Sequence, residues 1–369
     1  MNFDLSKTQK MLQESARDFL KRECPISKVR EIADSDDGHD ANLWTGIAEQ
    51  GWTGLTLPEE NDGLALSLVD LAAVSEEMGR FCLPSPFTAS VWASSLIAAS
   101  DNTELKGKLL PDLALGESIA TVALLEEGSN WNFASVQMGA VVSDSGVVLS
   151  GSKSLVLDAA SANTILVVAR QGEDLIVAVV DKSAEGLSLT ATPGMDLTRR
   201  FYHVDLDNVD AEVLASGAAA ETALKRSIQI GAIAACADLL GGMEWTLKTT
   251  VEYAQTRQQF DKPIGSYQAV QHQCADMLFF NESARSATYY AAWAIHENDP
   301  SGDEAVSIAK AYCSEVARLV GNSGIQIHGG IGFTWEHDLQ LYYKRAKASE
   351  YLFGDQQHHL ELLAQLIID

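Results

Sequence analysis

The pattern of hydrophobic and polar positions changes character twice along the chain. In residues 6–24 and 67–82, apolar residues recur every three or four positions, the spacing of one face of an α-helix. The turn-rich stretch "GWTGLTLPEENDGLALS" connects the two, and "CLPSPF" ends the second. The first part of the chain therefore predicts a small helical domain.

A strand pattern follows in residues 116–212. Short β-branched runs such as "SIATVAL", "TILVVAR" and "LIVAVVD" are separated by glycine, serine and aspartate at short intervals. This pattern predicts a β domain built as a sandwich or a barrel.

Long helices return in the last part of the chain. Residues 219–260 can form roughly ten turns, with glycines that permit close helix crossings. Further helices are predicted at residues 267–297, 301–320, 336–350 and 355–368.

The predicted fold class is α+β and multidomain, since 369 residues exceed the usual size of one domain. The three domains are an N-terminal α-helical domain (1–115), a middle β domain (116–212) and a C-terminal four-helix-bundle-like domain (213–369).

Charge and composition indicate which partners the chain is expected to avoid and in which compartment it is expected to reside. With 26 basic against 51 acidic residues, the net charge of −25 repels nucleic acid and anionic membranes, so neither is expected as a partner. No run of 18 apolar residues and no leader pattern occurs, so we expect neither a membrane span nor a signal peptide. Five singly spaced cysteines favour buried thiols in a reducing cytoplasm and no metal site.

Two segments carry candidate chemistry. In "GIQIHGGIGFTWEHD", Gly329, Gly330 and Gly332 let the backbone approach a ligand and offer amides to a phosphate, although a glycine turn between helices is also a common C-cap. In "YAQTRQQFDKPIGSYQAVQHQCADM", Arg257 and Phe260 close the long helix and offer a guanidinium and a flat apolar face. An arginine near a helix end is also favoured by the helix dipole alone.

Together these motifs resemble those of the acyl-CoA dehydrogenase family. The resemblance rests on "RQQFDKPIGSYQAVQHQCADM" and "QIHGGIGFTWEHDLQLYYKRAKA", on "LPEENDGLALSLVDLAAVSEEMGR" near the start, on "MDLTRRFYHVDLDNV", and on the order α, β, α over the whole chain.

The resemblance implies FAD as cofactor and oxidation of an acyl-CoA thioester to the trans-2-enoyl thioester. A carboxylate removes the α proton, the β hydrogen leaves as hydride to the flavin, and an electron-transfer flavoprotein takes the electrons. The flavin lies across a subunit interface, with the ADP part held by the neighbour's C-terminal motifs. On this chain the ADP-side set comprises Arg257, Phe260, Gln268, Gln326, Gly329 and Gly330.

The ring-side phrases of the family are altered here. Where members carry phrases like "TEPxAGSD" and "KxWITN", this chain reads "LLEEGSNW" (124–131) and "KSLVLDA" (153–159). Glu126, Gly128 and Ser129 remain, but the tryptophan and threonine become Leu155 and Val156 or Leu157. We therefore expect the β domain to lack most hydrogen bonds to a flavin ring.

Both positions that hold the catalytic base in the family are substituted. Phe353 stands at the glutamate of the "YEGT" phrase, and Gln259 stands at the alternative place on the long helix. Neither side chain can deprotonate a carbon acid.

Nearby carboxylates are poor substitutes for the base. Asp355 is expected to be the N-cap of the last helix and Glu350 a solvated helix charge, because an offset of two or three residues exceeds the reach of about 3 Å that a general base needs. Glu244 and Asp238 are expected at the surface or in ion pairs. His358 and His359 can be either solvated or directed at CoA.

Three hypotheses remain open. The chain is the non-catalytic subunit of a heteromeric acyl-CoA dehydrogenase, such as a heterotetramer acting on a steroid side-chain CoA, with a homologous partner that bears the catalytic glutamate. Alternatively it is a self-sufficient homotetramer with a displaced base, or a non-enzymatic scaffold of the same fold.

Overall fold

The computed structural model describes residues 4–143 and 146–368. The chain forms two compact units, each assembled from segments that are distant in the sequence. The first unit comprises Met1–Glu31, Leu68–Leu83 and Ala232–Asp369, and the second comprises Ile32–Ser67 and Pro84–Gly231. The predicted fold class is confirmed, whereas the three domain boundaries stay predictions.

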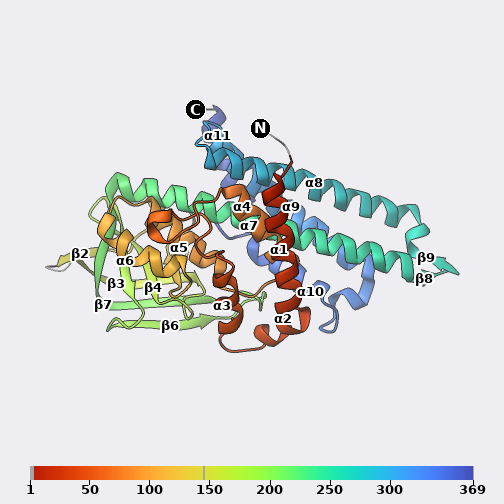
Figure 1. Cartoon of the computed structure of the whole chain (residues 1–369), viewed down its shortest axis with the longest axis horizontal. Coiled ribbons are helices and arrows are strands. Elements are labelled where there is room, and N and C mark those ends of the chain that lie inside the picture. The colour runs from red at the N-terminus through yellow and green to blue at the C-terminus, as the bar shows by residue number, and fades with distance from the viewer. Residues whose placement is uncertain (1–3, 144–145, 369) are drawn as a thin grey trace. The chain divides into compact units, whose positions relative to one another are not determined.

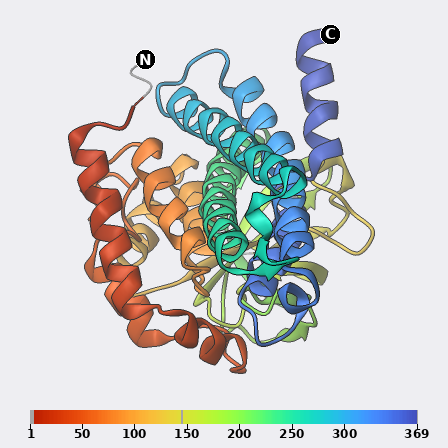
Figure 2. The same ribbon diagram turned by 90° about the vertical axis from the view of Figure 1, so that its right-hand side faces the viewer.

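The first unit is helical. Its helices are α1 (Lys7–Glu23), most of α2 (Ile26–Ala33), α4 (Leu68–Arg80), the larger part of α7 (Gly217–Thr256), α8 (Gln268–His296), α9 (Gly302–His328), α10 (Leu339–Ser349) and α11 (Gln356–Ile368). A hairpin of β8 (Gln258–Gln259) and β9 (Lys262–Pro263) and the short helices η3 (Ile264–Ser266) and η4 (Gly329–Phe333) complete it. Within this unit the C-terminal part of α7, α8 and α9 lie side by side (Figure 2) and share one apolar core that includes Leu240, Met277 and Val316.

Glycines bring α4 and α7 into close contact. A Cβ added at Gly241 would lie 1.8 Å from the carbonyl oxygen of Glu76, and one at Gly79 would lie 1.8 Å from the carbonyl oxygen of Asp238. Only a residue without a side chain fits at either position. The predicted close helix crossings are therefore confirmed.

Side chains cap the first and last helices. Ser6 and Gln9 form a capping box at the start of α1. The Asp355 carboxylate accepts the backbone N–H of His358 at 2.9 Å, one turn into α11. The predicted N-cap role of Asp355 is confirmed.

The second unit contains the strands. They are β1 (Ala120–Ala123), β2 (Ala140–Ser143), β3 (Gly146–Leu157), β4 (Thr164–Gln171), β5 (Asp174–Asp181), β6 (Leu187–Thr192) and β7 (Phe201–Ser216), with α5 (Phe87–Ala99) and α6 (Thr103–Ala114) beside them (Figure 1). The helix α3 (Ala41–Glu49), the short helices η1 (Glu59–Asn61) and η2 (Phe133–Ser135), and the first turns of α7 belong here too.

The strands form one mixed sheet that turns at its longest member. The order is β1-β4-β5-β7-β3-β2, with β6 also paired to β7, and β1 with β4 is a parallel pair. The first part of β7 pairs with β3 and β6, whereas its end pairs with β5. Residues from both halves of the sheet, such as Ile165 and Val204, enter one core, as the sandwich or barrel prediction requires.

Several predicted helix ends need correction. The long helix ends at Thr256, not at residue 260, because the chain turns into the hairpin β8–β9 and the residue before Pro263 disfavours helical backbone. The helix predicted at 301–320 continues to His328, since Gly321 and Gly324 allow Tyr343 and Thr246 to pack closely and do not interrupt it.

Among the described residues, α7 is the one helix long and apolar enough to cross a membrane. However, 72% of its most apolar 18-residue window is buried inside the protein, as in the core helix of a globular fold. The cysteines are free thiols, and four of the five are buried, as predicted, while Cys274 is half-buried.

Candidate functional site

The hairpin after α7 presents two members of the ADP-side set. Arg257 follows the helix directly, and its N–H donates to the Tyr253 carbonyl at 2.8 Å. Phe260 and Asp261 occupy the two-residue turn with φ of 56° and 62°, where glycine or asparagine is the usual choice. The Phe260 side chain is 87% exposed. Left-handed backbone at a non-glycine residue is strained, so the fold holds an exposed aromatic ring in place at a cost.

The glycine turn after α9 presents two more members of the ADP-side set, Gly329 and Gly330. Gly329 has a φ of 66°, and its N–H caps the helix by donating to the carbonyls of Ile325 and Gln326, so the C-cap interpretation applies to this residue. A Cβ at Gly329 or Gly330 would meet nothing within 4 Å, whereas one at Gly332 would lie 2.8 Å from the His328 Cβ. The first two glycines therefore leave open space beside the backbone, and Gly332 serves packing.

A stacked aromatic pair joins these two segments. The rings of Tyr253, near the end of α7, and His328, the last residue of α9, lie 4.4 Å apart at 22°. The remaining members of the set, Gln268 and Gln326, lie in the first turn of α8 and the last turn of α9, and all six members are exposed. The structure thus brings the predicted set to the segments that follow α7 and end α9.

The chemistry of this set fits a nucleotide diphosphate. Arg257 is an exposed guanidinium whose side chain has no hydrogen-bond partner within the part of the chain that the structure describes. A guanidinium pairs well with phosphate oxygens, an exposed ring covers a base or sugar, and glycines let the backbone come close.

The polar residues of the first ring-side phrase, 124–131, form hydrogen bonds that hold their own loop in place. The Glu126 carboxylate accepts the buried Lys153 ammonium at 2.6 Å and the backbone N–H groups of Gln137 and Met138 at 3.0 and 2.9 Å. Burial by itself would raise the pKa of Glu126, but Lys153 and the two amides outweigh it and hold the pKa below its usual range. Ser129 bonds to the backbone of Glu126 through its hydroxyl. These groups are already satisfied inside the loop.

The second phrase offers apolar side chains. Leu155 lies at a bulge of β3 with a φ of 52° and is 52% exposed, whereas Val156 and Leu157 are buried. In either register, no hydroxyl or indole occupies these positions.

The corner between α10 and α11 is built around Phe353. Its ring is 1% exposed and its φ is 58°, and Gly354 follows with a φ of 97°. The Phe353 carbonyl lies 2.8 Å from Nε2 of His359, a buried ring whose pKa falls to about 4, mainly because burial disfavours its charged form. His359 is therefore structural, and neither it nor half-buried His358 is freely solvated.

A buried lysine completes the corner. The Lys310 ammonium, fully buried on α9, donates to the Gly354 carbonyl and the Ser314 hydroxyl at 2.8 Å and to the Glu350 carbonyl at 3.1 Å. A cation at the C-terminal end of α10 satisfies carbonyls that have no partner in the helix. The sequence pattern did not reveal this role, because a lysine on a helix is usually exposed.

The carboxylates that could replace the base are all engaged. Glu350 is not a solvated charge: its side chain is 17% exposed and pairs with Lys347 at 2.6 Å. Glu244 lies 2.7 Å from Arg80 and 2.8 Å from Arg285, and although burial opposes its charged form, the two arginines lower its pKa to about 2. A carboxylate with so low a pKa is a weak base.

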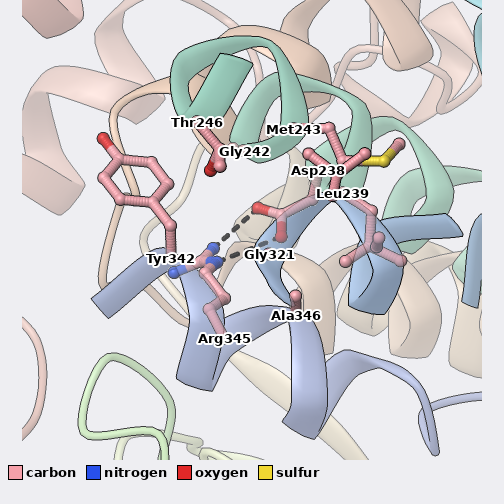
Figure 3. Close-up of a pocket in the computed structure, with 12 residues that line it drawn as sticks. Asp238, Leu239, Gly242, Met243, Thr246, Gly321, Tyr342, Arg345 and Ala346 are labelled. Atoms are coloured by element: carbon pink, nitrogen blue, oxygen red, sulfur yellow. Dashed lines mark hydrogen bonds and ion pairs between the residues drawn. The ribbon is translucent and has the colours of Figure 1, made fainter. Parts of the chain in front are cut away.

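Asp238 is also committed to an ion pair. Figure 3 shows its carboxylate facing the guanidinium of Arg345, and the two nitrogen–oxygen distances are 3.0 and 2.7 Å. The cavity beside the pair, between α7, α9 and α10, measures about 20 Å³, which is room for about one water and not for a substrate. Asp238 therefore holds two helices together.

Comparison with known proteins identifies the family of the chain. The acyl-CoA dehydrogenase N-terminal domain family matches residues 6–117, and the C-terminal domain family matches residues 221–368. The acyl-CoA dehydrogenase IpdE2 of Mycolicibacterium smegmatis is 31% identical over 364 residues, which cover 97% of this chain and 98% of that protein.

Two solved complexes have the same fold. A chain from a variant of the Tcur3481-Tcur3483 steroid ACAD is 30% identical with a TM-score of 0.90 over 98% of both chains. A chain of the ChsE4-ChsE5 complex from Mycobacterium tuberculosis is 25% identical with a TM-score of 0.91 over 100% of this chain and 99% of that one. The chain therefore belongs to the acyl-CoA dehydrogenase family.

Proposed function

We propose that this chain is the non-catalytic subunit of a heteromeric, FAD-dependent acyl-CoA dehydrogenase. The observation that carries the proposal is that the Phe353 ring, at the position that the family resemblance assigns to the base, lies buried while the ADP-side set is exposed. A homologous partner subunit supplies the catalytic glutamate and the pocket for the flavin ring. This chain completes the ADP side of the shared FAD from across the interface.

Each member of the set has a part in holding the cofactor. Arg257 would pair with pyrophosphate oxygens, Phe260 would pack on the nucleotide, and the open backbone at Gly329 and Gly330 would admit the phosphates. Gln268 and Gln326 offer amide donors and acceptors from the adjoining helix ends. FAD held in this way would supply the acceptor for the hydride that leaves the β carbon of the acyl group.

The relatives support a proposal for the substrate and the assembly, and the family resemblance and the free thiols support one for the acceptor and the compartment. One similar solved structure is a steroid ACAD made of two different chains, and another is a two-chain complex. We therefore propose a steroid side-chain CoA as the acyl-CoA substrate, a heterotetramer as the assembly, an electron-transfer flavoprotein as the acceptor and the cytoplasm as the location.

Two alternatives make different predictions. A self-sufficient homotetramer with a displaced base requires a free carboxylate, whereas Glu244, Asp238, Glu350 and Asp355 each have a hydrogen-bonding partner within the fold. A non-enzymatic scaffold requires no cofactor contact, yet an exposed arginine and a strained, exposed Phe260 serve no packing role.

One expression experiment separates the three. The chain is produced alone and together with the homologous dehydrogenase subunit, and FAD per chain and acyl-CoA turnover are measured. We expect little FAD and no turnover from the lone chain, and a yellow, active complex. One FAD per lone chain with turnover supports the homotetramer, and a colourless co-expressed complex supports the scaffold.

Replacing Arg257 by alanine tests the ADP side. We expect the dissociation constant of FAD from the complex to rise about 10- to 100-fold, because a charge-assisted, two-point contact to phosphate is lost. Fluorescence titration of the deflavinated complex with FAD measures this dissociation constant.

The control for this variant is Arg22→Ala, which removes another exposed arginine of the same unit. It is expected to leave FAD affinity unchanged. If Arg257→Ala binds FAD as tightly as Arg22→Ala, the ADP-side assignment is wrong.

A further inference from the structure

His328 occupies the junction between the two halves of the ADP-side set. It is the last residue of α9 and is buried, while Gly329 and Gly330 follow it on the exposed side. Its ring stacks on Tyr253, and its carbonyl accepts the Tyr253 hydroxyl at 3.4 Å. Stacked aromatic pairs contribute stability beyond the area they bury.

This pair links the hairpin to the glycine turn. Tyr253 accepts the N–H of Arg257 at its carbonyl, so the position of its backbone determines where the hairpin begins. Gly332 packs directly against His328, since a Cβ at Gly332 would touch the His328 Cβ. The stack is therefore a direct tie between Arg257 and the open glycines.

The protonation state of His328 is constrained by its neighbours. Nδ1 lies 2.8 Å from the Gly324 carbonyl, which only accepts, so Nδ1 carries the proton. Nε2 is buried and has no hydrogen-bond partner among the described residues. The titratable groups that face the ring are Tyr253 on α7 and His337, whose ring meets it edge-on at 4.8 Å. A second proton at Nε2 would be a buried charge without a partner.

We propose that His328 is a positioning residue of the flavin site, which holds the glycine turn against the end of α7 only while its ring is neutral, so that acid loosens the turn and weakens FAD binding. This inference rests on the proposed function. His328 itself is buried and is not assigned a contact with the cofactor.

The direction of the pH effect follows from linkage. Burial lowers the pKa of His328 below its ordinary value in the folded turn; the hydrogen bond to Gly324 opposes this effect in part, and the charge of His337 adds to it. When the turn opens, the pKa returns towards about 6.5. The open turn thus binds more protons, so the packed turn is fully stable above about pH 6.5 and loses stability as the pH falls through the unfolded and then the folded pKa.

Two substitutions separate the stack from the titration. His328→Phe keeps an aromatic ring on Tyr253 but cannot be protonated, and His328→Ala removes the ring. FAD dissociation constants are measured for the complex with the homologous subunit between about pH 5.5 and pH 8, a range that brackets the ordinary histidine pKa.

At pH 8 we expect His328→Ala to bind FAD about tenfold more weakly than the wild type, the loss of one aromatic pair. His328→Phe should bind within about threefold of the wild type at pH 8 and keep that affinity at pH 5.5, where the wild type weakens. Equal pH dependence in His328→Phe and the wild type would refute the proton-linked role. Unchanged affinity in His328→Ala would refute the positioning role.

Arg257→Ala in the same titration distinguishes this inference from the proposed function. If Arg257→Ala binds FAD normally, the site assignment itself fails. If Arg257→Ala loses FAD and His328→Ala does not, the site stands and only the role of His328 fails.

Hydrogen exchange on the lone chain gives a second, cofactor-free readout. His328→Ala should speed amide exchange of residues 329–333 without changing the exchange of α8, and acid should speed it in the wild type beyond the intrinsic pH effect. His328→Phe should protect these amides as the wild type does at pH 8. Identical protection of residues 329–333 in all three proteins would overturn the inference.

Discussion

Phe353→Glu is expected to produce no acyl-CoA dehydrogenase activity in the lone chain and to lower its free energy of unfolding by about 2–4 kcal/mol. The ring it replaces is 1% exposed, so the new carboxyl group must enter an apolar site. Lys310 lies nearby in the corner, but its three N–H donors are already used by two carbonyls and a hydroxyl. The introduced acid therefore lacks a partner.

An acid introduced at Phe353 would also stand in a chain whose ring-side phrases differ from those of the family. Leu155, Val156 and Leu157 bring no hydroxyl or indole to the flavin ring, and Glu126 is tied to Lys153. Urea unfolding and an acyl-CoA assay with an artificial electron acceptor measure the two effects.

The matched control is Phe353→Leu, which keeps the corner apolar and is expected to cost about 1 kcal/mol. Turnover by Phe353→Glu that is absent in Phe353→Leu would mean that the ring side is functional in this chain, and the heteromer proposal would fail.

Gly241→Ala is expected to cost at least about 3 kcal/mol of folding stability or to abolish soluble expression. The added Cβ would lie 1.8 Å from the Glu76 carbonyl oxygen and 2.4 Å from the Arg80 nitrogen, both of them backbone atoms that cannot rotate away. The helices α4 and α7 must then separate. The buried Glu76 carboxylate, which pairs with Arg285 and accepts the Tyr289 hydroxyl, would lose its partners.

The neighbouring glycine is the control. A Cβ at Gly242 would meet Tyr342 at 3.6 Å, which is an ordinary contact. Gly242→Ala should therefore stay within about 1 kcal/mol of the wild type, since alanine favours the helix. Thermal unfolding of the two variants compares them, and equal midpoints would disprove the close crossing.

The sequence pattern predicted what depends on local periodicity and capping. The helices, the strands of the middle region and the N-cap at Asp355 are features that local periodicity and capping determine. The predicted end of α7 lies too far along the chain, because apolar spacing continues to Phe260 while the strained hairpin at Phe260 and Asp261 decides the path.

The sequence pattern could not predict the buried lysines, because the groups that accept their hydrogen bonds are distant in the sequence. Lys310 is satisfied by carbonyls 40 and 44 residues away, and Lys153 by a carboxylate 27 residues before it. A lysine in a helix or a strand is usually exposed, so the residue type alone predicts the opposite of what the structure shows. The role of His328 likewise depends on Tyr253, 75 residues earlier in the chain.

The bond between Glu126 and Lys153 gives a residue of the predicted ring-side motif a structural role of its own. The carboxylate also accepts two backbone N–H groups, so its loss would remove three bonds that hold the loop, whether or not a flavin ring rests there. The requirements of folding are therefore sufficient by themselves to account for a glutamate at this position. A glutamate at this position is thus weak evidence for a flavin-ring site, whereas an exposed position of β3 such as Leu155 is a more informative one to compare between relatives.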